Sequence, residues 1–160
     1  MRFTGETSTT MAVEPGIVDT NVLVYALDAD ATQHLAARAL LEAERDASTT
    51  LYVTSQILCE FYSIVTNPRR VPNPRRSGDA LSAVSGLLAF LHVLPVPART
   101  VDGWLNLLRR RPVTGGDVFD LQIIATMQAN DVHRIYTFNT GDFEIFPELT
   151  VVTPAPGVQR

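Results

Sequence analysis

Lysine is absent from this chain of 160 residues, and all 13 of its basic residues are arginines. This excludes mechanisms that need a lysine, such as those of phosphate-binding-loop nucleotidases, Schiff-base enzymes, and receiver or haloacid-dehalogenase proteins with their usual lysine. The single cysteine, Cys59, excludes an internal disulfide and a multi-cysteine metal site, and we expect it to be a small buried side chain. No apolar run approaches the ~18 residues of a membrane-spanning helix, and the polar first residues lack a signal-peptide core. We therefore expect a cytoplasmic protein with no membrane partner.

Apolar residues make up 46% of the chain and charged residues 19%, which is typical of a globular domain and excludes a disordered chain. The net charge of −4 is unevenly distributed: residues 1–60 carry −6, residues 61–116 carry +6, and residues 117–160 carry −4. An ordinary mixed surface is the simpler explanation. The alternative is a basic middle segment that holds an anionic polymer beside an acidic site.

Short apolar segments alternate with helical patterns, which indicates an α/β fold with a parallel sheet covered on both faces. We expect one domain over residues 15–154 with a central five-stranded, mostly parallel sheet flanked by helices. Residues 1–14 are expected to form a loose extension, with Met11 as an alternative start, and residues 155–160 a tail. The expected strands lie at residues 17–18, 51–53, 92–94, 135–138 and 149–152. The expected helices lie at residues 20–27, 32–45, 55–66, 78–91, 98–111 and 117–129.

Acidic residues stand where expected strands end and expected helices begin. In parallel sheets ligands bind outside the carboxyl ends of the strands, so these positions are the first to test for a site. Asp19 directly follows the first strand, and Asp142 lies shortly after the fourth. Asp117 and Asp120 open a helix and, three residues apart, share one of its faces. Glu60 lies near the middle of a helix on a polar stripe, where a solvated surface position is the alternative.

The other acids also have structural explanations. Asp19 could be a turn residue, with Thr20 or Asn21 capping the helix that follows. Asp117 is a good helix cap after two glycines, and Asp142 could cap a short turn. None of these acids is decisive alone, and the argument for a site depends on their combination.

Four acids from four segments, at positions 19, 60, 120 and 142, are expected to meet in one crevice at the strand ends. Bare carboxylates in one small site repel each other and raise their proton affinity, so a bound cation is the natural solution. Oxygen ligands without cysteine or paired histidines favour Mg²⁺ or Mn²⁺ over Zn²⁺. Such a site can bind a phosphodiester, activate water and stabilise the leaving oxygen.

Three stretches, IVDTNVLVYAL, TSQILCEFYSIVTNP and FDLQIIATMQANDVHRIYTFNTGDF, resemble the PIN-domain ribonucleases, in particular the VapC-type toxins of bacterial toxin–antitoxin pairs. The resemblance extends from about residue 17 to residue 154, with the four acids in the expected order. It implies a PIN-like fold and a Mg²⁺- or Mn²⁺-dependent endoribonuclease that hydrolyses RNA phosphodiester bonds.

The resemblance also implies roles for individual residues. Asp19, Glu60 and Asp120 match the most regular metal-binding acids of the family. Many members carry an aspartate where this chain has Asn139, and this departure puts a second metal position in doubt. We assign the fourth catalytic and metal-binding position to Asp142, which precedes a phenylalanine as in the family. The positions expected to support the site are Thr20, Asn21, Asp117, Thr137 and Asn139.

The resemblance further implies a homodimer that is silenced by a cognate VapB-type antitoxin, whose C-terminal segment occupies the active-site groove. An acidic groove would suit a basic antitoxin side chain.

The non-enzymatic alternative is a catalytically silent PIN-like module that binds RNA or a protein. A haloacid-dehalogenase phosphatase also begins with an aspartate after a first strand, but Asn21 stands where that family needs a second aspartate.

The segment NPRRVPNPRRSG must be a loop, because it contains three prolines. Its arginines are the best candidates for contacts to an RNA backbone, and a solvated loop is the alternative. These arginines are Arg69, Arg70, Arg75 and Arg76. We expect Trp104 and the other helical aromatic residues to belong to the core rather than to stack on bases.

Overall fold

The computed structural model describes residues 13–47 and 49–157. Its centre is a sheet of five strands in the order β3-β2-β1-β4-β5, and every neighbouring pair runs parallel. The strands are β1 (Gly16–Val18), β2 (Leu51–Val53), β3 (His92–Val93), β4 (Arg134–Tyr136) and β5 (Thr150–Val152). The expected α/β fold with a five-stranded parallel sheet is confirmed. Most of the extension expected over residues 1–14, Met11 included, lies outside the described residues, as do residues 158–160 of the expected tail.

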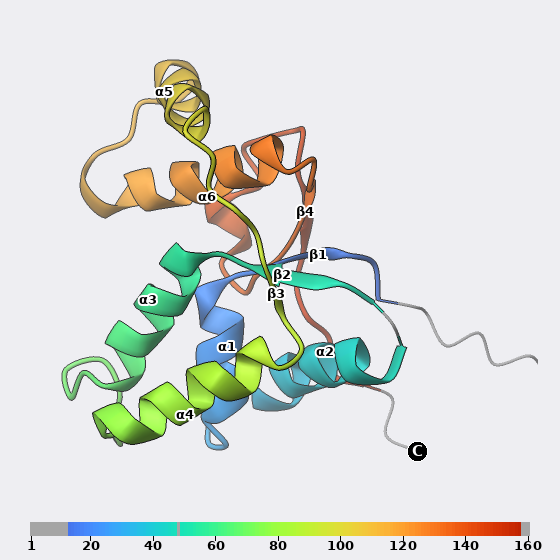
Figure 1. The fold of residues 1–160 in the computed structure, drawn as a ribbon, viewed down its shortest axis with the longest axis vertical. Coiled ribbons are helices and arrows are strands. Elements are labelled where there is room, and N and C mark those ends of the chain that lie inside the picture. Colours follow the sequence, from blue (N-terminus) through green and yellow to red (C-terminus); the bar gives the residue numbers. More distant parts are fainter. Residues whose placement is uncertain (1–12, 48, 158–160) are drawn as a thin grey trace, which may run out of the picture.

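Helices cover both faces of the sheet, as expected. Figure 1 shows α5 and α6 on one side of the strands and α1, α2 and α4 on the other. The helix α3 packs against α1 and α4. The helices are α1 (Thr20–Leu27), α2 (His34–Ala47), α3 (Ser55–Val65), α4 (Ser77–Leu88), α5 (Thr100–Arg110) and α6 (Val118–Ala129). Among the described residues, none of these helices is long and apolar enough to cross a membrane.

The central strands form the middle of the hydrophobic core. Ile17, Val18 and Ile135 have no exposed surface, which is expected for parallel strands covered on both faces. At Gly16 the strands β1 and β4 approach so closely that an added Cβ would lie 2.9 Å from the backbone oxygen of Arg134. Glycine is therefore required for this spacing at the start of β1.

Polar residues follow the carboxyl ends of three neighbouring strands. Asp19 follows β1, Thr54 follows β2 and Thr137 follows β4. The backbone N–H of Asp19 donates to the carbonyl oxygen of Tyr136 at 3.0 Å, so the ladder between β1 and β4 continues into this edge. Because the strands are parallel, these side chains lie at one edge of the sheet, where α1 and α3 begin.

Three expectations about individual residues are wrong. Asp19 itself is the N-cap of α1 and accepts from the backbone N–H of Thr20, so the cap is neither Thr20 nor Asn21. Asp117 makes no capping hydrogen bond, because its backbone is already helical within the short 3₁₀ turn Gly115–Asp117. Cys59 is exposed, because it lies on the outer face of α3.

Candidate acidic site

The site is centred on Asp19, which is only 8% exposed at the end of β1. Its Oδ1 accepts from the backbone N–H of Thr20 at 2.7 Å, and its Oδ2 accepts from the hydroxyl of Thr137 at 2.7 Å. Burial raises the pKa of Asp19 above its ordinary value, although these two hydrogen bonds lower it. The charges of Glu60 and Asp142 raise the same pKa further. Asp19 is thus a buried carboxylate with rigid support and two acidic neighbours.

Asn21 and Thr137 join the start of α1 to the end of β4. The amide nitrogen of Asn21 donates to Oδ2 of Asp19 and to the Thr137 hydroxyl, both at 3.2 Å. The Oδ1 atom of Asn21 accepts from the backbone N–H of Phe138 at 3.2 Å. The Thr137 hydroxyl also accepts from the backbone N–H of Asn139 at 3.0 Å. These contacts hold the Asp19 carboxylate in one orientation from two elements far apart in the sequence.

Glu60 joins the site from α3 with both carboxylate oxygens engaged. Oε2 accepts from the hydroxyl of Thr20 at 3.0 Å, and Oε1 accepts from the amide nitrogen of Gln56 at 2.9 Å. Thr20 therefore links the two acids, since its backbone N–H donates to Asp19 and its hydroxyl donates to Glu60. Glu60 is half-buried and oriented, rather than a fully solvated surface residue.

Asp120 has the most strongly shifted pKa of the site. Burial, followed by the charge of Asp142 and then those of the other acids, raises the pKa of Asp120 to about 7. Those other acids are Asp19, Glu60 and Asp117. Since a charge acts on a pKa mainly over short distances, the four other acids lie in the neighbourhood of Asp120. Asp142 has the largest charge effect on Asp120, although its own side chain is exposed.

The carboxylates nevertheless do not form a closed ligand set. Within residues 13–47 and 49–157, no three His, Cys, Asp or Glu side chains are close enough together to hold a metal ion. The donors that are present are carboxylate oxygens supported by hydroxyl and amide groups, which suits a hard divalent cation. A cation would also relieve the repulsion that, after burial, raises the pKa values of Asp19 and Asp120. The residues therefore fit a divalent ion in chemistry, and side chains of the cluster would have to move to coordinate it.

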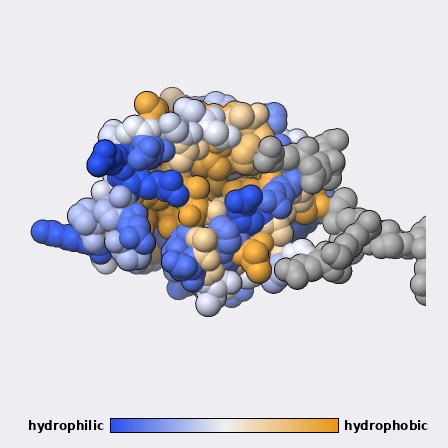
Figure 2. All heavy atoms as spheres, turned by 90° about the horizontal axis from the view of Figure 1, so that it is seen from below, coloured by the Kyte–Doolittle hydropathy of each residue, from blue (hydrophilic) through white to orange (hydrophobic). Residues whose placement is uncertain are grey.

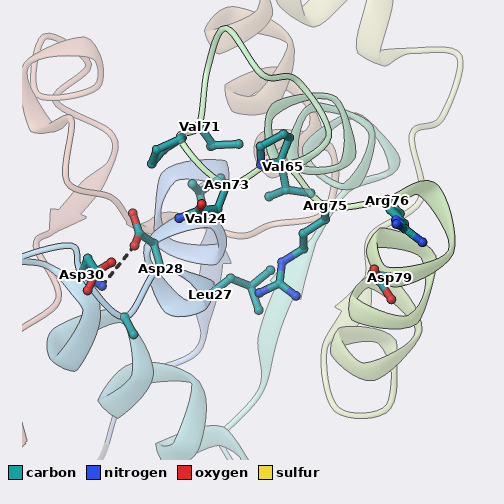
Figure 3. A pocket seen from close by; sticks show the side chains of 13 residues that line it. Val24, Leu27, Asp28, Asp30, Val65, Val71, Asn73, Arg75, Arg76 and Asp79 are labelled. Atoms are coloured by element: carbon teal, nitrogen blue, oxygen red, sulfur yellow. Dashed lines mark hydrogen bonds between the residues drawn. The ribbon is translucent and has the colours of Figure 1, made fainter.

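The arginines of the loop do not join this cluster. All four are exposed, and two of them, Arg75 and Arg76, line a separate cavity of about 470 Å³ (Figure 3). The cavity lies between the end of α1, the end of α3 and the start of α4. Its lining on α1 begins at Val24, four residues after Thr20 and so roughly 6 Å along the helix.

This cavity has an apolar floor and a charged rim of both signs. Figure 2 shows an apolar hollow, surrounded by hydrophilic residues, on the face seen from below. Figure 3 shows Asp28 and Asp30 on one side and Arg75, Arg76 and Asp79 on the other. Three acids beside two arginines weaken an attraction for phosphate at this point. Contacts between the four arginines and RNA remain a prediction.

Two residues near the cluster were not singled out from the sequence as site residues. Gln56 donates from its amide nitrogen to both Glu60 and the backbone oxygen of Phe119, at 2.9 and 3.1 Å. Its own Oε1 is buried without a hydrogen-bond partner among the described residues. The available signal was its place one helical turn before Glu60 on the same polar stripe. Phe119 precedes Asp120 and is 51% exposed, which no apolar periodicity predicts.

Comparisons with known proteins give one family. A model of the PIN domain matches residues 16–149. Ribonuclease VapC43 of Mycobacterium tuberculosis and a VapC ribonuclease of Mycobacterium bovis are each 42% identical over 72 residues, which is 45% of this chain and 49% of the relative. The chain thus spans about half the length of the curated relatives it matches.

Two solved structures share the fold at low sequence identity. VapBC2 of Rickettsia felis, bound to a promoter DNA fragment, is 19% identical with a TM-score of 0.65 over 88% of this chain and 99% of that one. VapC20 of Mycobacterium tuberculosis, a toxin that cleaves the sarcin–ricin loop, is 19% identical with a TM-score of 0.65 over 86% and 98%. At this level of identity the likeness concerns the fold alone.

Proposed function

This chain belongs to the PIN-domain family, and from that premise we propose that it is a metal-dependent endoribonuclease and the toxin of a toxin–antitoxin pair. The observation that carries the proposal is the group of carboxylates at the carboxyl edge of the sheet. In that group, burial and the charges of four other acids raise the pKa of Asp120 to about 7. The relatives that this chain matches over about half of their length are ribonucleases of the VapC type, which supports RNA as the substrate.

The proposed metal site consists of Asp19, Glu60, Asp120 and Asp142, with Mg²⁺ or Mn²⁺ as the ion. We prefer Asp142 to Asn139 for the fourth position, because its charge has the largest effect of any acid on Asp120. When bound, the ion supplies charge neutralisation at the phosphodiester and a more acidic water molecule.

The protein residues bind and orient the reacting groups. Thr20, Asn21 and Thr137 hold the Asp19 carboxylate, and Thr20 and Gln56 hold Glu60, so both acids keep fixed directions. In the proposed hydrolysis, a water oxygen bonds to phosphorus as the bond from phosphorus to the leaving ribose oxygen breaks. The water gives up one proton, and the leaving oxygen gains one. Neither lysine nor a histidine nucleophile is needed.

The proposed partners are the RNA substrate, a VapB-type antitoxin and a second copy of the chain. Structures that share this fold include a toxin–antitoxin complex from Klebsiella pneumoniae and VapBC-1 from nontypeable Haemophilus influenzae, which supports an antitoxin as partner. The acidic cluster would attract a basic antitoxin side chain. We place the protein in the cytoplasm, where cellular RNA would be its substrate.

A catalytically silent PIN-like module is the second candidate. It is favoured by one observation: among the described residues no three acidic, cysteine or histidine side chains lie close enough together to hold an ion. Incubation of the protein with single-stranded RNA and Mg²⁺ or Mn²⁺, with and without chelator, separates the two. A nuclease cleaves only with the ion, whereas a silent module binds RNA and leaves it intact.

A further inference from the structure

Phe119 is an exposed aromatic residue that directly precedes Asp120 in the chain. α6 buries nearly all of its apolar side chains: Leu121 and Ile123 are 2% exposed and Ile124 is fully buried. Phe119, one residue before Asp120, is 51% exposed on the same helix. The expectation that the helical aromatic residues belong to the core is therefore wrong for Phe119. Leaving a phenylalanine ring in water costs stability that its burial would recover.

Hydrogen bonds fix Phe119 close to the proposed catalytic acids. One nitrogen, Nε2 of Gln56, donates to Oε1 of Glu60 at 2.9 Å and to the backbone oxygen of Phe119 at 3.1 Å. The two acceptor oxygens are therefore no more than about 6 Å apart. Gln56 thus ties the start of α6 to α3 across the cluster. The backbone of Phe119 is therefore held in a helix and not in a loose loop.

The charges around Phe119 decide which part of an RNA strand could contact it. The carboxylates of Asp117 and Asp120 flank the ring in sequence, and both belong to the group of acids whose charges interact. These carboxylates repel a phosphate unless a bound cation lies between them, whereas an uncharged base can contact the ring directly. Aromatic rings stack on unpaired bases with little sequence preference, and such stacking is common in single-strand recognition.

We propose that Phe119 stacks on an unpaired base of the RNA, next to the phosphate that lies at the acidic cluster. This inference rests on the proposed ribonuclease function and deepens it, because it assigns a binding residue for the substrate. Gln56 is the positioning residue, because it holds Glu60 and the backbone of Phe119 in fixed positions relative to each other. The contact with the base would position the RNA before the phosphodiester bond is cleaved.

The test uses the full chain and a single-stranded RNA that carries 2-aminopurine at successive positions. Stacking on an aromatic ring changes the fluorescence of this base, and a purely structural residue would not produce that signal. Asp19→Asn serves as the background for binding, so that the RNA is not cleaved. Phe119 is then replaced by alanine, leucine or tryptophan, and Val101→Ala is the control, since Val101 is also 51% exposed but lies on α5.

We expect Phe119→Ala and Phe119→Leu to weaken RNA binding by about 10-fold and to abolish the fluorescence change at one position. Phe119→Trp should keep both, Val101→Ala should change neither, and all variants should melt near the parent temperature. Leucine that performs as well as phenylalanine would overturn stacking, as would a loss of antitoxin binding without a change in RNA binding. If wild-type protein cleaves RNA while these variants bind normally, stacking fails and the proposed function stands. If no RNA is cleaved with either ion, the proposed function itself fails.

Discussion

Asp120→Asn removes a carboxylate whose pKa is raised, mainly by burial, from 3.8 to about 7. In the unfolded chain this group is charged above pH 3.8, whereas in the folded protein it resists ionisation until about pH 7. The folded state therefore binds more protons between these values, so stability falls as the pH rises through this window. Below pH 3.8 the group is neutral in both states and does not lower the stability of the folded protein. Asparagine is neutral at every pH, so Asp120→Asn should remove the loss of stability at higher pH.

The size of the effect follows from the two pKa values. Their difference corresponds to at most ~4 kcal/mol. The Asp120 carboxylate is partly exposed and water screens it, so we expect a gain of ~1–2 kcal/mol at pH 8. For a chain of this size that is a rise of roughly 2–8 °C in melting temperature. The gain should nearly disappear at pH 4.

Thermal unfolding with a chelator present, at pH 4 and at pH 8, measures this directly. Asp102→Asn is the matched control, because both acids lie in the first turn of a helix, Asp102 in α5 and Asp120 in α6. Asp102 is exposed, whereas Asp120 is partly buried. The control should keep or lower stability at both pH values, since it removes only a favourable helix-dipole charge. A lower melting temperature for Asp120→Asn at pH 8, or an equal gain at both pH values, would refute the reasoning.

Three further predictions concern the residues that support the site and the arginines proposed to bind the RNA. Gly16→Ala should lower the free energy of unfolding by ~1–3 kcal/mol in chemical denaturation, because its Cβ would lie 2.9 Å from a β4 carbonyl oxygen. The control Gly78→Ala should not lower it, because a Cβ at Gly78 meets nothing within 4 Å. Gln56→Ala should weaken Mn²⁺ binding about 10- to 100-fold in calorimetry, because Glu60 loses a partner; unchanged affinity would count against a positioning role. Replacing the four loop arginines by glutamine should weaken RNA binding and flatten its salt dependence, and an unaltered slope would exclude phosphate contacts. The arginines are Arg69, Arg70, Arg75 and Arg76.

The fold could be predicted because its signals are local. The strands are short apolar runs such as Leu51–Val53, and the helices repeat their apolar residues at helical spacing. The cap of α1 could not be chosen from the sequence, since Asp19, Thr20 and Asn21 are three good capping residues in a row. Cys59 was assigned to the core from its residue type, which says nothing about the face of α3 on which it lies.

The acids could be named from the sequence, but their arrangement could not. Position after a strand identified Asp19 and Asp142, position at a helix start identified Asp120, and the family resemblance assigned their roles. The contact of Gln56 with Phe119 joins residues 63 apart in the sequence, and no local pattern predicts it. The exposure of Phe119 could not be predicted either, because apolar residues lie on all sides of α6. The sequence also could not show that the carboxylates influence one another while, in the part of the chain that the structure describes, no three are close enough together to hold an ion.

The central claim is that Asp19 belongs to a metal-dependent ribonuclease site. The most direct measurement is sequencing of the RNA fragments made by the wild-type protein and by Asp19→Asn, with Mg²⁺ or Mn²⁺ and with chelator. We predict discrete cleavage sites for the wild type with either ion, and none with chelator or with a folded Asp19→Asn variant. The same cleavage by Asp19→Asn, or cleavage that persists in chelator, would contradict the account.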